Sequence, residues 1–334
     1  MKPHTAAVCC LSALLAIAVA PAQAADKNKA WIDPLAASQE DPDFLIQGEY
    51  GSSQPGAAAG VQVVALGDGK FDAYVLQDGL PGLGWTCDKQ RVVIKGERGE
   101  KGITLASADG KISAVISNGK ITLTRQGEKE LTLPRIERAS PTLGAKPPAG
   151  AVVLFDGSSV DQWEKGKIEN GLLVANNCIS KQKFKNHTLH IEFRTPYMPY
   201  ARGQGRGNSG VYYCGRWETQ VLDSFGLEGA QNECGGIYSI SKPFLNMCLP
   251  PLSWQTYDVV FTAAKFDADG KQTAWPRITV KLNGVLIHEN LELAKNNTTA
   301  APIGGPLKDE GGPVFLQLHG NPVYYRNIWV LPTK

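Results

Sequence analysis

The sequence predicts an all-β protein of two modules, of which the second is a two-sheet sandwich or jelly roll. Short runs of alternating apolar and polar residues recur from Asp43 to the end of the chain, separated by turn formers. No segment of ten or more residues shows a convincing 3.6-residue apolar period, so long helices are not expected. The 36 glycines and 21 prolines fit many strands joined by tight turns.

Residues 1–24 have the composition of a secretory signal peptide. Lys2 supplies a positive charge, residues 6–20 are apolar and uncharged, and Ala22-Gln23-Ala24 matches a small-x-small cleavage site. The apolar run is too short to cross a bilayer as a stable helix, and no other apolar stretch is longer. We therefore expect an exported protein, periplasmic or extracellular, without a membrane span.

The charge balance of the full chain bears on the class of partner it binds. The 334 residues carry 34 Lys and Arg against 32 Asp and Glu, a formal net charge of +2. A balance so close to neutral favours neither nucleic acid nor an anionic membrane as the main partner.

The cysteines are few and odd in number once the predicted signal peptide is removed. They are Cys87, Cys178, Cys214, Cys234 and Cys248. Exported proteins often form disulfides, but an odd number cannot pair completely within one chain. We expect Cys234 and Cys248 to be bonded to each other. No CxxC or Cys/His zinc spacing occurs. We predict no cofactor, and the sequence leaves a divalent metal undecided.

The first module is predicted to span residues 43–139. The polar, irregular residues 25–42 before it are interpreted as a tether. Ser117-Asn118-Gly119 between two alternating runs is a strong hairpin signal. Residues 140–150, which contain three prolines, are interpreted as a linker.

The second module is predicted to span residues 151–334. Asn283-Gly284 is a further hairpin signal. About 185 residues of short strands are typical of a two-sheet sandwich or jelly roll. The predicted strands include residues 152–155, 189–194, 211–221, 257–262, 277–282, 314–319 and 328–331.

Alternation gives three of these strands a polar face. The polar members are His190, Glu192 and Arg194 in the first, Glu218 and Gln220 in the second, and Gln317 and His319 in the third. A solvated outer sheet is the ordinary explanation of such faces. Carboxylate, guanidinium, amide and imidazole groups gathered on one concave sheet would instead suit a sugar-binding cleft with acid/base groups. We expect the three rows to share one concave face.

Two loops and several aromatic residues are interpreted as the rim of such a cleft. Residues 205–210 match the pattern G-x-G-x-x-G, but a strand follows instead of the helix that dinucleotide binding requires. Residues 197–210 are therefore interpreted as a rim loop, and residues 232–251, rich in turn formers, as another. Most of the aromatic residues are expected in the core, while one or two, Tyr238 among the candidates, could stack on a sugar ring.

Seven sequence pieces then occur in a recognisable order over residues 151–334. They are VVLFDGSSVDQWE, HIEFR, GNSGVYYCGRWETQVLD, GGIY, SWQTYDVVFTA, ITVKLNGV and RNIWV. By this ordered set the second module resembles the bacterial 3-keto-disaccharide hydrolase family, also described as 3-keto-α-glucoside 1,2-lyase and 3-keto-2-hydroxyglucal hydratase domains. The strings PTLGAKPPAGAVVLFDG and ECGGIYS resemble a secreted two-module subgroup. The resemblance implies a concanavalin-A-like jelly roll and adds nothing specific about the first module.

The resemblance also implies a chemistry. A ketone at C3 of a sugar acidifies the C2 proton, so a base can remove it and the C1 substituent can then leave. The reaction needs a base, donors to the enolate oxygen and an acid for the leaving oxygen. We assign Glu218 and His319 as base and acid, with Glu192 as a second carboxylate. We assign substrate binding to Arg194, Asn208, Gln220, Asp223, Gln317 and Tyr238. Asp223 lies on the opposite alternation from Glu218, so it is structural unless the strand ends or bulges first.

Three functions stay open on the sequence alone, because fold does not settle function. They are an enzyme that cleaves 3-keto-glycosides by elimination or hydrolysis, a non-catalytic carbohydrate-binding module, and a structural or cell-surface interaction protein. A retaining glycanase of this fold would place two carboxylates about 5 Å apart, as Glu-x-Asp-x-Glu. Gln220 stands where the second acid should be, which disfavours ordinary double displacement. The expected partner is an oligosaccharide or glycoside.

Overall fold

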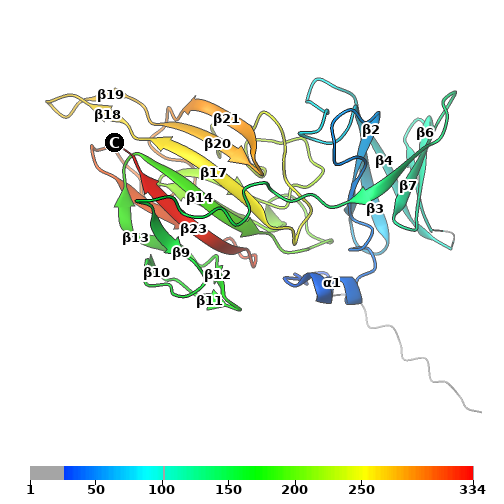
Figure 1. Cartoon of the computed structure of the whole chain (residues 1–334), viewed down its shortest axis with the longest axis horizontal. Coiled ribbons are helices and arrows are strands. Elements are labelled where there is room, and N and C mark those ends of the chain that lie inside the picture. The colour runs from blue at the N-terminus through cyan, green and yellow to red at the C-terminus, as the bar shows by residue number, and fades with distance from the viewer. Residues whose placement is uncertain (1–25, 101, 334) are drawn as a thin grey trace, which may run out of the picture.

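The computed structural model describes residues 26–100 and 102–333 as two β-modules placed end to end (Figure 1). The predicted signal peptide lies outside the described residues. Within them, helix is confined to α1 (Pro34–Glu40) and the 3₁₀ turn η1 (Gly203–Gly205). No helix in the described ranges is long and apolar enough to span a membrane. The predicted all-β fold is confirmed.

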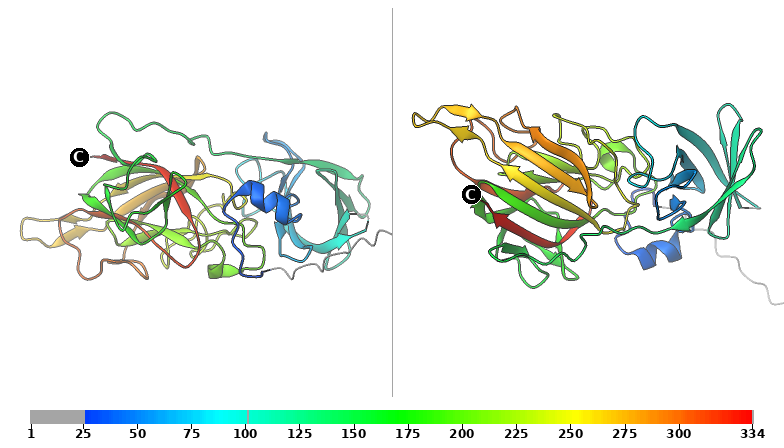
Figure 2. Two further views of the ribbon diagram at one scale, coloured as in Figure 1. Left: turned by 90° about the horizontal axis from the view of Figure 1, so that it is seen from below. Right: turned by 45° about the horizontal axis from the view of Figure 1, so that its top comes forward.

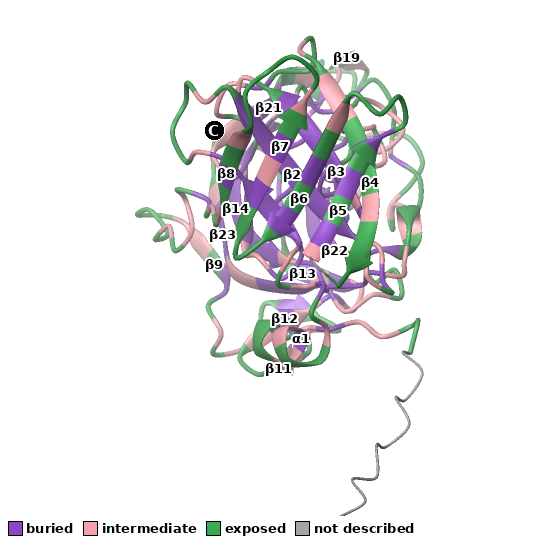
Figure 3. Cartoon of the chain, turned by 90° about the vertical axis from the view of Figure 1, so that its right-hand side faces the viewer, coloured by how far each residue is buried: buried purple, intermediate pink, exposed green. Residues whose placement is uncertain are grey.

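The first module is a closed antiparallel barrel, in which each strand pairs with the next and the last returns to the first. Burial alternates along β6 and β7, as Figure 3 shows, because every second side chain points into the barrel. The described strands of the barrel are β1 (Gly48–Tyr50), β2 (Ala59–Ala65), β3 (Lys70–Gln77), β4 (Arg91–Gly99), β5 (Gly102–Ser107), β6 (Ile112–Ser117), β7 (Lys120–Arg125) and β8 (Leu131–Ile136).

β2 departs from this alternation, since it is buried along its whole length. Its inward residues Val61 and Val63 belong to the barrel core, while Val64 on the outer face packs into the core cluster of the second module. The modules therefore meet through apolar contact as well as through the chain that joins them.

The second module is a sandwich of two antiparallel sheets. The smaller sheet has the order β10 (Trp163–Glu164), β13 (Cys178–Phe184), β22 (Gly312–Leu316), β15 (Ser209–Tyr213) and β16 (Trp217–Val221). The larger sheet has the order β11 (Ile168–Glu169), β12 (Leu172–Val174), β23 (Tyr324–Pro332), β14 (His187–Arg194), β17 (Gln255–Thr262), β20 (Arg277–Leu282) and β21 (Val285–Glu292), with β9 (Val152–Phe155) on β23. A separate hairpin pairs β18 (Lys265–Phe266) with β19 (Gln272–Ala274).

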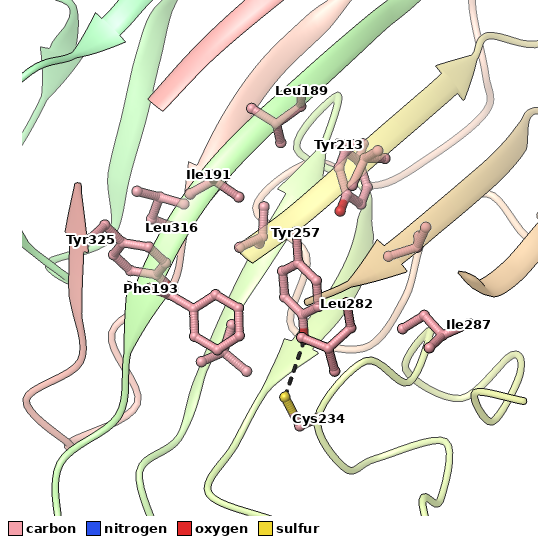
Figure 4. Close-up of a cluster of buried hydrophobic side chains, with 14 of the residues drawn as sticks. Leu189, Ile191, Phe193, Tyr213, Cys234, Tyr257, Leu282, Ile287, Leu316 and Tyr325 are labelled. Carbon is pink, nitrogen blue, oxygen red and sulfur yellow. Dashed lines mark hydrogen bonds between the residues drawn. The ribbon is translucent and has the colours of Figure 1, made fainter. Parts of the chain in front are cut away.

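The core of the sandwich consists of the apolar strand faces that alternation predicted. Ile191 and Phe193 of β14 are fully buried, and they face Leu316 and other side chains of the opposite sheet (Figure 4). Trp217 and Val221 of β16 join the same cluster. Leu318 lies between Gln317 and His319, so alternation over the predicted strand 314–319 puts it on this face. It is 42% exposed instead, because β22 ends at Leu316 and the alternation ends with it.

Residues 26–42 are ordered, although an irregular tether was expected. α1 begins after Asp33, whose carboxylate accepts hydrogen bonds from the Leu35 and Ala36 amides. Trp31 exchanges two backbone hydrogen bonds with Tyr197 of the second module, at 3.0 and 2.9 Å. A helix cap and one buried aromatic ring hold this segment. Neither produces a periodic pattern of apolar residues, so the sequence did not predict the order.

Residues 140–150 run along the outside of the sandwich, as Figure 2 shows for the chain that follows β8. The Ser140 hydroxyl bonds that of Thr256 at 2.6 Å, and the Thr142 hydroxyl donates to Asp258 at 2.6 Å. The Ala145 carbonyl accepts from the Trp329 indole at 3.0 Å. This segment is therefore fixed to the outer face of the larger sheet.

The expected disulfide between Cys234 and Cys248 is not present, since all five cysteines of the described residues are free thiols. Both side chains are buried beside oxygen partners. The Cys234 sulfur lies 3.4 Å from the Tyr257 hydroxyl (Figure 4), and the Cys248 sulfur lies 3.5 Å from the Leu222 carbonyl. The two thiols also hydrogen-bond each other, so the predicted partners are adjacent but not covalently bonded.

We expect Trp31→Ala to lower the free energy of unfolding by about 3–5 kcal/mol, because it empties a buried aromatic site. The ring is 8% exposed and packs on Tyr197 with 5.4 Å between centroids. Trp31→Phe keeps most of this packing and serves as the control. Chemical denaturation measures both, and equal midpoints for wild type and Trp31→Ala would show that residues 26–42 are a loose tether after all.

Candidate functional site

A hollow of about 100 Å³ lies over the outer face of the smaller sheet, and it gathers most of the predicted site residues. We call it the polar hollow. Among the predicted residues, those that line it are Asn208, Glu218, Gln220, Tyr238, Gln317 and His319. Gln204, Thr299 and Ala300 line it as well and were not predicted.

Strand register explains why Glu218 sits at the centre of the polar hollow. In the pairing of β15 with β16, Tyr212 lies opposite Glu218 and Gly210 lies opposite Gln220. All of these positions face away from the core, because the alternate residues of both strands point into it. A Cβ at Gly210 would overlap the Glu218 carboxylate. The glycine thus leaves the space that the carboxylate occupies.

Tyr212 connects Gln317 to Glu218. The Gln317 Nε2 donates to the Tyr212 hydroxyl oxygen at 3.0 Å. The hydroxyl in turn interacts with the Glu218 carboxyl, and the Thr299 carbonyl lies 3.4 Å away. Because the oxygen already accepts from Gln317, its own proton is directed onward to these acceptors. Alternation alone puts Tyr212 on the polar face, but its contact with Glu218 follows only from the register.

Amide side chains surround the other side of the carboxyl. The Gln220 amide satisfies its neighbours when its nitrogen faces Glu218, donating to Oε1 at 2.7 Å and to the Ser209 carbonyl at 3.1 Å. Asn208 Nδ2 donates to the Gln204 carbonyl at 2.8 Å. Glu218 is therefore enclosed by neutral donors.

This environment changes the acidity of Glu218. The side chain is buried, with 3% exposure, and none of the described residues lining the polar hollow is Lys or Arg. Burial raises the pKa of the Glu218 carboxyl to about 8, and the Tyr212 hydroxyl offsets part of this rise. Glu218 is thus mostly protonated at pH 7 and becomes an available base near pH 8. A carboxyl so perturbed in a cleft is a mark of function.

Tyr238 and His319 lie toward the rim of the polar hollow. The Tyr238 amide donates to the Glu218 carbonyl at 3.2 Å, so the loop that carries Tyr238 pairs with β16. His319 follows the end of β22 and is exposed. Its imidazole is open to solvent and to a ligand at once, as an acid for a leaving group requires.

Glu192 and Arg194 do not share this site, although one common concave face was expected for the three polar rows. β14 belongs to the larger sheet, so its outward polar side chains lie on the outer face of that sheet. The polar hollow lies on the other side of the sandwich, over the smaller sheet. Arg194 stacks on Trp254, with its Cζ 4.9 Å from the ring centroid, and donates to the Ile32 carbonyl at 2.9 Å. It holds the N-terminal segment and does not reach the polar hollow.

Glu192 lies in a satisfied polar network under residues 140–150. Its carboxylate accepts from Arg326 Nε at 2.6 Å, from Asn327 Nδ2 at 2.9 Å and from the Gly144 amide at 2.5 Å. Burial opposes its ionisation, but hydrogen bonds from His190 and these groups outweigh burial and lower the pKa of Glu192 to about 2. A carboxylate so strongly ionised is a structural anion and a poor base.

Asp223 also lies outside the polar hollow. β16 ends at Val221, and Asp223 accepts from Arg206 Nε at 2.6 Å in a pair of buried side chains. Its role is to neutralise that arginine. The described residues contain no group of three or more His, Cys, Asp or Glu side chains arranged to hold a metal ion.

Residues 150–331 match the family described as the 3-keto-alpha-glucoside-1,2-lyase-like domain. The match covers more than half of the chain, and the chain belongs to this family. The family that the sequence motifs indicated is thereby confirmed for the second module.

Two solved structures are similar to the same part of the chain. A "putative glycosyl hydrolase" from Parabacteroides distasonis ATCC 8503 is 32% identical, with a TM-score of 0.50, over 56% of this chain and 85% of that protein. Another "putative glycosyl hydrolase" from the same organism is 18% identical, with a TM-score of 0.41, over 55% of this chain and 94% of that protein. No curated protein matches the chain significantly.

We expect Glu218→Gln to stabilise the fold above pH 8 relative to wild type. The folded pKa of about 8 lies above the ordinary value of 4.5, so wild type loses stability as the pH rises from 4.5 to about 8. The cost is about 1.4 kcal/mol per unit of pKa difference, so the variant should gain a few kcal/mol at pH 9 and almost nothing at pH 4.5. Urea denaturation at both pH values measures this, with Glu289→Gln at an exposed site as control. A gain that is the same at both pH values would contradict it.

We expect Glu192→Gln to act in the opposite sense. The folded pKa of about 2 lies below the ordinary value, so the carboxylate stabilises the fold above pH 4.5 and this contribution is lost as pH falls toward 2. The variant should be about 2–3 kcal/mol less stable than wild type at pH 7, with a smaller gap at pH 3. Acid titrations of both proteins test this. A variant as stable as wild type at pH 7 would show that the network does not hold residues 140–150.

Proposed function

We propose that this chain is an exported enzyme that cleaves 3-keto-glycosides by removing the C2 proton and expelling the C1 substituent. The observation that carries the proposal is the buried Glu218 carboxyl, with a raised pKa and only neutral donors around it, in a chain of this family. Similarity to a described glycosyl hydrolase supports action on a glycosidic bond. Export rests on the composition of residues 1–24.

In the proposed reaction the ionised Glu218 takes the C2 proton of the bound 3-keto sugar. The electron pair of the C2–H bond forms the enolate, whose oxygen accepts hydrogen bonds from neutral donors of the polar hollow. The electrons then return to form the C1–C2 double bond as the C1–O bond breaks. His319 gives a proton to the leaving oxygen. Addition of water to the double bond completes net hydrolysis.

The raised pKa of Glu218 suits this role. A base whose pKa lies near the working pH is strong enough to pull on a carbon acid and is still ionised in a useful fraction of molecules. A cation beside Glu218 would lower its pKa and weaken it as a base. The neutral donors Gln220 and Tyr212 hold the carboxyl in place without that loss.

The arrangement of carboxylates supports elimination over ordinary double displacement. Retaining hydrolysis needs two carboxyl groups about 5 Å apart around one bond. Glu218 is the one carboxyl among the described residues that line the polar hollow. Glu192 lies on the other sheet, and Asp223 is bound to Arg206.

A non-catalytic carbohydrate-binding module is the second candidate. The observation in its favour is that four amide side chains line the polar hollow, because amides bind sugar hydroxyls as both donors and acceptors. It predicts sugar binding without turnover.

We expect Glu218→Gln to lower kcat/KM on 3-keto-trehalose or 3-keto-sucrose by about 10²–10⁴-fold, because the amide keeps the shape and removes the base. Wild-type kcat/KM should rise with pH up to about 8, where Glu218 ionises. Glu289→Gln, at an exposed site, should leave kcat/KM and its pH dependence unchanged. Product analysis with the parent disaccharides as negative substrates measures the effect, and deuterium from D₂O should appear at C2 of recovered substrate or product.

Two other outcomes would change the assigned base or the proposed function. Full activity of Glu218→Gln would move the base role to His319. Binding of a 3-keto-glycoside by wild type with no turnover would favour the carbohydrate-binding module.

A further inference from the structure

The loop between β14 and β15, residues 195–208, touches the polar hollow on one side and the barrel on the other. Gln204 and Asn208 line the polar hollow. Tyr200, Arg202 and Arg206, interleaved with them, reach the barrel. We call residues 195–208, which include most of the segment 197–210 predicted above, the rim loop from here on.

The outward contacts of the rim loop fall on the turn between β2 and β3. The Tyr200 hydroxyl donates to Asp68 at 3.0 Å, and the Arg202 guanidinium donates to the Leu66 carbonyl at 3.1 Å. The Tyr200 ring lies directly over Gly67, where a Cβ would overlap it. A side chain therefore cannot be added to the barrel at this point without displacing the Tyr200 ring.

Arg206 anchors the rim loop from within. It is 5% exposed and pairs with Asp223, and its remaining nitrogens lie 3.4 Å from the Ala65 carbonyl and 3.4 Å from Gln47 Oε1, both in the barrel module. The Arg206 carbonyl also accepts from the Asp223 amide at 3.0 Å. The backbone between Gln204 and Asn208 is thus held by Asp223 of the second module, and Arg206 adds two longer contacts with the first module.

A second segment of the sandwich connects the barrel to the rim loop. The Gly226 carbonyl accepts from Arg91 of β4 at 2.6 Å, and a Cβ at Gly226 would lie 2.7 Å from the Tyr74 ring of β3. Six residues further on, the Asn232 carbonyl accepts from Gln204 Nε2 at 2.7 Å. The barrel therefore also reaches Gln204 through this segment.

Among the described residues, the inside of the barrel is filled mainly by apolar side chains. The barrel's contacts with the second module come from β2, β3, the connection between β3 and β4, and the start of β4. We propose that the barrel is a buttress for the active site: it fixes the rim loop so that Gln204 and Asn208 are held against the substrate, with Tyr200 and Arg206 as positioning residues. The link to catalysis rests on the proposed function, whereas the link to loop order does not.

Gly67→Ala in the full chain tests the buttress, with Gly69→Ala as its matched control. Both glycines lie in the same turn with left-handed backbones, at φ +82° and +72°, so both variants carry similar strain. A Cβ at Gly67 displaces the Tyr200 ring, whereas a Cβ at Gly69 meets only the barrel's own Arg98, at 3.1 Å. The difference between the two variants therefore reports on the rim loop.

We expect amide hydrogen exchange in residues 198–209 to be at least about tenfold faster in Gly67→Ala than in Gly69→Ala, because the displaced loop opens more often. In a Tyr200→Ala background, Gly67→Ala should add nothing, since the clash has been removed. On a 3-keto-glycoside, kcat/KM of Gly67→Ala should be about 10–100-fold below that of Gly69→Ala, because displacement of substrate-positioning groups by about 1 Å has such an effect.

Equal exchange in the two variants, or an additive effect in the Tyr200→Ala background, would overturn the proposal. So would faster exchange with unchanged turnover, because the loop would then be supported without serving the site. Should wild type turn over no glycoside, the proposed function fails, and the exchange measurements still decide whether the barrel orders the rim loop.

Discussion

Apolar side chains from both sheets of the second module meet in one core, and this packing limits where every polar side chain of those strands can point. Because successive residues of a strand alternate, burying Trp217, Thr219 and Val221 forces Glu218 and Gln220 to the opposite surface. A shift of one residue in register would bury the carboxyl in the core without a partner. The cost of burying a carboxyl without hydrogen-bond partners opposes such a shift. The position of the candidate base thus follows from the packing of its apolar neighbours.

The two outer faces of the sandwich differ in which groups surround their buried carboxyl side chains. On the larger sheet, Glu192 meets Arg326 and stays ionised far below neutral pH. On the smaller sheet, Glu218 is buried among neutral donors and holds its proton to about pH 8. The same side chain is therefore a structural anion in one place and a candidate base in the other. This contrast depends on the few groups within hydrogen-bonding distance of each carboxyl.

The modules are coupled where the barrel meets the loops that connect sandwich strands. Loops have few constraints of their own, so those that carry functional groups need support from a rigid neighbour. Here Arg206 and Asp223 form a buried pair beside that contact, and such a pair favours one geometry because either partner alone would be an uncompensated charge. The interior of the barrel stabilises the first module, while its outer surface faces the site.

The sequence by itself determined the all-β class, the family of the second module, and which residues of each strand share a face. Ile191, Phe193, Trp217 and Val221 are core residues for the reason that alternation indicates. Alternation is a property of one strand, however, and it carries no information on which sheet of a sandwich that strand joins. Long-range pairing alone placed Glu192 on the other surface, set Tyr212 opposite Glu218 and made Asp223 the partner of Arg206. Tertiary structure decided the protonation of Glu218 as well, because burial and neighbouring charge, which set a pKa, exist only once the sheets and loops have come together.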